Sequence, residues 1–209
     1  NFIYTLSSAM TREILTTVDE NKNIYEWNSN GIIFGRNVKM KNAVYIFNPG
    51  TGSTSELNTG MDLPGFLSFS KDGTSMAVRG TNFDQLNEVW VGKTGTTPQR
   101  ITDMTSQLKG WKVPLNEIVR WKSKDGAEIE GVLLKPSDYD PQKKYPLLVV
   151  IHGGPTGIDR PEPAPGYVYP IMQWCEKGAL VLRVNYRGSA GYGEKFRSLN
   201  VRNLGVGDM

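Results

Sequence analysis

The chain has 209 residues, of which 38% are hydrophobic and 22% charged, as is typical of a globular protein. Its net charge of +3 is small and its basic residues are scattered, which argues against a nucleic-acid-binding surface. One cysteine and one histidine exclude an intramolecular disulfide and argue against a zinc site, and no segment approaches the ~20 apolar residues of a membrane span. We therefore expect a soluble protein without a metal or cofactor, while its compartment (cytoplasmic, periplasmic or secreted) and oligomeric state stay open.

The first part of the chain contains a repeat of about 44 residues. Val-Tyr-Ile at residues 44–46 recurs as Val-Trp-Val at 89–91, and residues 31–34 match residues 74–78. A period of this length, built from short strands and Gly-rich turns, is typical of β-propeller blades, with a β-sandwich as the alternative. We predict that residues 1–112 are the C-terminal blades of a β-propeller.

A tight turn and a partial third copy support this interpretation. Asp72-Gly73 predicts a hairpin turn, because this dipeptide readily adopts positive φ. Residues 2–4 and 13–16 resemble an earlier, partial copy of the repeat. Two or three blades cannot close a ring, and the chain lacks an initiator Met, so we expect it to be cut at both ends and both of its domains to be incomplete.

The pattern changes after about residue 111. Alternating residues 117–121, a turn at 124–126 and a second strand at 128–134 predict a hairpin. Residues 146–151 are apolar on both faces, which predicts a strand buried inside a mainly parallel sheet. Residues 169–177 predict a helix that ends at Gly178, followed by a strand at 179–184. We assign residues 113–209 to an α/β domain, in which Cys175 is a buried apolar residue.

The candidate site residues directly follow the apolar strand at residues 146–151. His152, Gly153, Gly154 and Pro155 form a Gly-rich loop of the kind that holds an oxyanion-hole N–H in α/β-hydrolases, although a simple tight turn is the alternative. His152 is not expected to be the general base, because the catalytic histidine of these enzymes follows the nucleophile and the acid. We expect it to shape the loop instead.

We find no nucleophile in this chain. Ser189 lies in a sequence similar to G-x-S-x-G, but Arg187 replaces the first glycine and no helix-forming run follows. With no elbow, no late Asp and no late His, a triad cannot be assembled. We therefore predict no catalytic residue within the chain, which would be inactive by itself.

Three segments together resemble the prolyl oligopeptidase family of serine peptidases, in its acylaminoacyl-peptidase and dipeptidyl-aminopeptidase branch. They are residues 131–136, 145–155 and 185–193, in the order and spacing of that family. The resemblance implies an N-terminal part of an α/β-hydrolase domain, preceded by a propeller that covers the active site. It also implies that Gly154 offers an oxyanion-hole N–H, and that His152 stands where other branches have a tyrosine.

The resemblance further assigns a loop beside the site to Asn185, Tyr186, Arg187, Gly188 and Tyr192. Residues 205–208 resemble the entry to the helix that precedes the strand bearing the serine. Dipeptidyl peptidases use an acidic pair to hold the substrate's amine, but Asp19-Glu20 has the sequence of a polar turn, and Glu162 fits a rim of the site or a rigid connector.

The leading interpretation is part of a serine peptidase that cleaves small peptides by acyl transfer, with this segment supplying the propeller lid and the oxyanion loop. A carboxylesterase-type α/β-hydrolase and a non-catalytic β-propeller binding protein are the alternatives.

Overall fold

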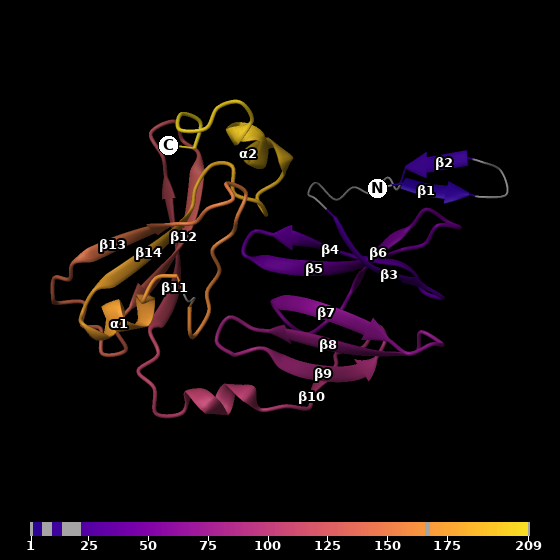
Figure 1. Ribbon diagram of the computed structural model, residues 1–209, viewed down its shortest axis with the longest axis horizontal. Helices are drawn as coiled ribbons and strands as arrows, with labels where there is room; N and C mark the ends of the chain where they lie inside the picture. Colours follow the sequence, from indigo (N-terminus) through magenta and orange to yellow (C-terminus); the bar gives the residue numbers. More distant parts are fainter. Residues whose placement is uncertain (1, 6–9, 14–21, 166–167, 209) are drawn as a thin grey trace.

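The computed structural model describes residues 2–5, 10–13, 22–165 and 168–208. They form a small hairpin, two four-stranded sheets that lie one above the other, and a third four-stranded sheet beside them (Figure 1). The hairpin consists of β1 (Phe2–Thr5) and β2 (Met10–Glu13). The predicted partial copy at residues 13–16 extends beyond β2, and like the predicted turn at Asp19-Glu20 it lies mostly outside the described residues.

The 44-residue repeat corresponds to two sheets of the same design. In each, four strands follow one another in chain order and all pairs are antiparallel. The strands of the first sheet are β3 (Asn23–Asn28), β4 (Gly31–Val38), β5 (Lys41–Phe47) and β6 (Thr54–Leu57). Those of the second are β7 (Leu63–Phe69), β8 (Ser75–Thr81), β9 (Glu88–Lys93) and β10 (Gln99–Arg100). The repeated segments fall on matching strands, and the described residues form no closed ring.

The two sheets pack face to face through a shared apolar core. Ile33 and Val44 of the first sheet cluster with Met76 and Val78 of the second, and all four are at most 1% exposed. The turn before β8 has the predicted geometry, with Gly73 at a φ of 73° and its N–H donating to the Ser70 carbonyl at 2.8 Å. The hairpin turn thus forms as its local sequence predicts, and the two sheets are stabilised by the core that they share.

A short connecting segment leads to the third sheet. It contains the 3-10 helix η1 (Met104–Leu108) and ends at β11 (Leu115–Lys122). The buried carboxylate of Glu88 holds this segment, because it accepts hydrogen bonds from the Thr102 hydroxyl and from the backbone N–H groups of Met104 and Thr105. The domain boundary that we predict after residue 112 falls within this connection.

The third sheet is mixed and has the order β11-β12-β14-β13. Its other strands are β12 (Glu128–Lys135), β13 (Leu147–Ile151) and β14 (Leu180–Asn185). The helix α1 (Ile171–Glu176) precedes β14 and is shorter than predicted, and Gly178 follows it at a φ of 84°. After β14 come α2 (Glu194–Arg197) and the 3-10 helix η2 (Ser198–Asn200), and residues 205–208 form turns rather than a helix.

The prediction of a buried strand in a mainly parallel sheet is wrong for the described residues. Only β13 and β14 are parallel, and β13 is an edge strand. Leu147, Val149 and Ile151 are 53%, 54% and 65% exposed, whereas Val150 faces the core. An apolar run predicts a strand that needs cover, but it does not say which element supplies the cover.

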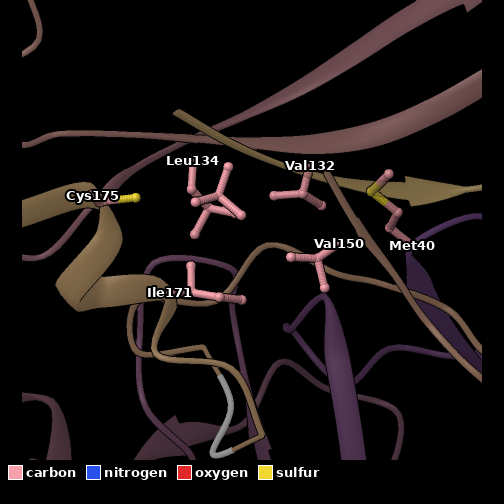
Figure 2. Close-up of a cluster of buried hydrophobic side chains, with 7 residues drawn as sticks. Met40, Val132, Leu134, Val150, Ile171 and Cys175 are labelled. Carbon is pink, nitrogen blue, oxygen red and sulfur yellow. The ribbon is translucent and has the colours of Figure 1, made fainter. Parts of the chain in front are cut away.

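One side chain from the first sheet lies in the core of the third. Met40, in the turn between β4 and β5, is 2% exposed and packs in a cluster with Val132, Val150 and Ile171 (Figure 2). The preceding residue, Lys39, donates its N–H to the Gly191 carbonyl at 2.6 Å and pairs through its ammonium with Glu130 at 2.7 Å. The first and third sheets are thus joined by a buried apolar side chain and by hydrogen bonds, and the sequence alone does not predict this contact.

Candidate functional site

The Gly-rich loop predicted to hold an oxyanion directly follows β13. Gly153 and Gly154 are exposed, and among the described residues none accepts a hydrogen bond from either backbone N–H. Gly154 has a φ of 126°, and a Cβ built on it would lie 2.9 Å from the Gly157 nitrogen. A glycine is therefore required at residue 154, and its N–H is available to a negatively charged oxygen.

His152 is held from two sides by the loop that follows β14. The Tyr186 ring stacks on the imidazole with the centroids 4.6 Å apart, and the Tyr186 hydroxyl donates to the His152 carbonyl at 2.8 Å. Burial raises the pKa of Tyr186, which keeps its hydroxyl protonated as a donor. On the other side, Nε2 of His152 lies 3.0 Å from the Ser189 hydroxyl oxygen.

The contact between His152 and Ser189 is one that sequence reasoning missed. The distance is within the range found between a nucleophile and its base. However, the Ser189 side chain is completely buried, so a substrate carbonyl has no path to it in this conformation. Both residues belong to recognisable motifs, but their contact joins positions 37 residues apart and has no local signal.

Asn185, at the end of β14, connects the loop that follows β14 to Asp159, in the segment that follows the Gly-rich loop. Its side-chain amide accepts a hydrogen bond from the Asp159 N–H at 2.7 Å and donates to the Asp159 carbonyl at 2.9 Å. It also donates to the Tyr192 hydroxyl, which in turn donates to Glu130 at 3.1 Å. Burial and the nearby carboxylate of Glu130 raise the pKa of Tyr192, so this residue acts as a neutral bridge.

Arg187 and Gly188 shape the loop that follows β14 through contacts with other parts of the chain. Arg187 is 8% exposed and forms an ion pair with Asp125, in the turn between β11 and β12. Gly188 has a φ of 93°, and a Cβ there would overlap the Asn200 side chain. Of the residues that we predict beside the site, Tyr186 contacts the Gly-rich loop directly through His152, whereas Arg187 and Gly188 contact the β11–β12 turn and Asn200.

Two ion pairs surround the exit of the oxyanion loop. Arg183 on β14 pairs with Asp159 at 2.6 Å and with Glu162 at 2.7 Å. The neighbouring Arg160 donates to the Met40 carbonyl at 3.1 Å and to the Asn37 side chain at 2.9 Å. Glu162 is therefore engaged by an arginine, and the 159–162 segment is attached both to the third sheet and to the turn of the first.

A hollow of about 320 Å³ opens beside the oxyanion loop. Its lining comes from the end of β13, the Gly-rich loop, the start of α1 and the ion pair between Asp159 and Arg183. The lining residues include Val150, His152, Gly153, Asp159, Tyr169, Ile171 and Arg183. A larger hollow of about 590 Å³ lies near Phe83, Pro114 and Pro161 and contains none of the predicted site residues. The smaller hollow adjoins the exposed Gly153 and is therefore the candidate site.

The described part of the chain contains no group of three His, Cys, Asp or Glu side chains arranged to hold a metal ion. Within the same residues, no helix has the length and apolar character needed to cross a membrane. Cys175 is 1% exposed, and burial raises the pKa of its thiol to about 11, as expected for an apolar core residue.

No protein-family model matches the chain, but individual proteins do. Dipeptidyl-peptidase 5 of Porphyromonas gingivalis is 22% identical over 199 residues, which cover 93% of this chain and 28% of that protein. Among solved structures, the acylaminoacyl peptidase of Pyrococcus horikoshii matches 99% of this chain and 31% of its own, with a TM-score of 0.75 and 24% identity.

An acylaminoacyl peptidase solved in complex with Z-Gly-Gly-Phe-chloromethyl ketone covers 95% of this chain, with a TM-score of 0.72 and 22% identity. The match covers 30% of that solved chain. The chain therefore has the fold of one segment of these peptidases, and it spans less than a third of the length of the relatives that it matches.

Proposed function

We propose that the protein containing this chain belongs to the prolyl oligopeptidase family and is a serine peptidase that cleaves small peptides by acyl transfer. The observation that carries the proposal is the backbone N–H of the exposed Gly154, from which no described residue accepts a hydrogen bond, in the loop after β13 that Tyr186 and Ser189 hold. The neighbour solved with a peptidyl chloromethyl ketone supports a peptide as the substrate.

In this proposal Gly154 supplies one half of the oxyanion hole. When a serine attacks the scissile carbonyl, the carbonyl oxygen becomes negatively charged, and an N–H already aimed at it stabilises the transition state. The protein does not need to reorganise at that moment, because the loop conformation is already set by Tyr186 and Ser189. The second donor and the Ser/Asp/His triad lie, in this proposal, in the part of the relatives' length that this chain does not span.

The two repeated sheets are, in the same proposal, blades of a β-propeller that covers the active site. Their common strand order and their face-to-face packing support this assignment. The edge of β13 is the natural place for a further strand of the α/β-hydrolase sheet, because an edge strand presents unpaired backbone N–H and C=O groups to which another strand can bond.

The test is turnover by the full-length protein, with a blocked peptide amide and a simple ester as substrates and with labelling by a serine-reactive phosphonate. Peptide turnover together with labelling of one serine outside residues 1–209 is the expected result. Ester turnover without peptide turnover would instead identify a carboxylesterase, and neither labelling nor turnover would identify a binding protein.

A further inference from the structure

We propose that Ser189 is a positioning residue that donates a hydrogen bond to Nε2 of His152, holds the imidazole ring in place and thereby fixes the Gly154 N–H. This inference rests on the proposed function, because it assigns a role to Ser189 in presenting the oxyanion donor. It differs from a catalytic role in that Ser189 touches His152 and not the substrate.

The hydrogen-bond partners of His152 determine where its proton lies. Nδ1 is 3.1 Å from the Gly153 carbonyl oxygen, and a carbonyl can only accept a hydrogen bond. Nδ1 must therefore carry the proton. In a neutral imidazole Nε2 is then an acceptor, so the Ser189 hydroxyl, 3.0 Å away, must be the donor.

Ser189 is itself fixed, so it can act as an anchor. Its side chain is fully buried, and its N–H donates to the Tyr186 carbonyl at 3.0 Å in a tight turn. Two residues later the Gly191 carbonyl accepts the N–H of Lys39, from the turn of the first sheet that inserts Met40 into the core. The anchor is thus attached to both parts of the chain.

The loop that Ser189 supports has little support of its own. A Cβ added to Gly153 would contact nothing within 4 Å, the three atoms nearest to one added at Gly154 belong to Thr156 and Gly157 of the same loop, and both glycines are exposed. With no side chains, residues 153 and 154 lose their preferred conformation easily. The position of the Gly154 N–H therefore depends on how firmly the nearby His152 is held, and Ser189 and Tyr186 hold its ring from outside the loop.

The first experiment reads the tautomer directly in the 209-residue chain. Because the chain contains one histidine, a long-range nitrogen–proton NMR spectrum at alkaline pH shows a single imidazole. We expect Nδ1 to be protonated and Nε2 unprotonated, and we expect Ser189→Ala to shift the Nε2 resonance, because Nε2 loses its hydrogen-bond donor. A wild-type spectrum with Nε2 protonated, or an unchanged spectrum in Ser189→Ala, would overturn the proposal.

The second experiment measures catalysis by the full-length protein. In Ser189→Ala we expect kcat to fall by roughly 10- to 100-fold with KM nearly unchanged. The reason is that a shift of the Gly154 N–H by about 1 Å weakens its hydrogen bond to the oxyanion in the transition state. The rate of phosphonate labelling should fall in parallel. Ser198→Ala, which removes a hydroxyl from the nearby helix η2, is the matched control and should leave kcat unchanged.

Thermal unfolding separates positioning from simple stabilisation. A lower melting temperature in Ser189→Ala, with kcat per folded molecule unchanged, would assign Ser189 a structural role only and refute the proposal. Tyr186→Phe, which removes the hydrogen bond to the His152 carbonyl, gives a second, independent loss of support and should lower kcat in the same way. A wild-type protein with no turnover and no labelling would refute the proposed function, whereas an active wild type with an unaffected Ser189→Ala variant refutes only this inference.

Discussion

The oxyanion role of Gly154 leads to a prediction in which the adjacent glycine serves as the control. The change is Gly154→Val in the full-length protein. Its φ of 126° is strained for any side chain, which costs about 1–3 kcal/mol, and a Cβ at 2.9 Å from the Gly157 nitrogen must displace the backbone. The N–H of residue 154 then moves away from the oxyanion, and losing one such donor costs roughly 10²–10³ in rate.

The assay is the acylation rate in single-turnover kinetics, together with the melting temperature. We expect the rate per folded molecule to fall by roughly 10²–10³, while the strain of about 1–3 kcal/mol lowers the melting temperature without preventing folding, because both glycines of the loop are exposed. Gly153→Ala adds a Cβ into open space and should keep the acylation rate within about threefold. A Gly154→Val variant that acylates as fast as the wild type would refute the oxyanion role.

Three further predictions concern stability and reactivity. Burial raises the pKa of Glu88, but hydrogen bonds from Thr102, Met104 and Thr105 outweigh burial and lower this pKa from 4.5 to about 2. The stabilisation that the Glu88 carboxylate gives the folded state is therefore complete above pH 4.5 and is lost as the pH falls towards 2. Glu88→Gln should therefore lower the free energy of unfolding, measured in urea at pH 7, by about 2 kcal/mol and should flatten the dependence of stability on acid pH. The control Asp103→Asn, which removes an exposed ion pair with Arg100, should cost under about 0.5 kcal/mol. Equal losses in the two variants would contradict the role of Glu88. Met40→Ala should lower the free energy of unfolding by about 2–5 kcal/mol in the same measurement. Met104 is 46% exposed, so Met104→Ala should cost far less. Similar losses in the two variants would show that the Met40 contact does not stabilise the chain. The 209-residue chain should not react with a serine-directed phosphonate, and stoichiometric labelling of the buried Ser189, detected by mass spectrometry, would show that it is a nucleophile after all.

Much of the local structure could be predicted from the sequence, because it depends on neighbours along the chain. Alternating apolar residues and the Asp72-Gly73 turn predict the β7–β8 hairpin, and the repeat predicts a first sheet of the same order. The same holds for the helix that ends before Gly178 and for the loop that follows β13. For these features a hydrogen bond or a preferred φ within a few residues decides the conformation.

The sequence by itself thus determined the strands, the turns, the repeat and the residue types of an oxyanion loop. Only the tertiary structure decided that β13 is an edge strand, that Met40 enters the core of another sheet, and that Ser189 is bonded to His152. These contacts join residues that are far apart in the chain, and no periodicity records which apolar side chain fills which core or which hydroxyl meets which ring nitrogen. They depend on how the sheets pack against one another, and that packing is decided by the sum of many small, non-local interactions.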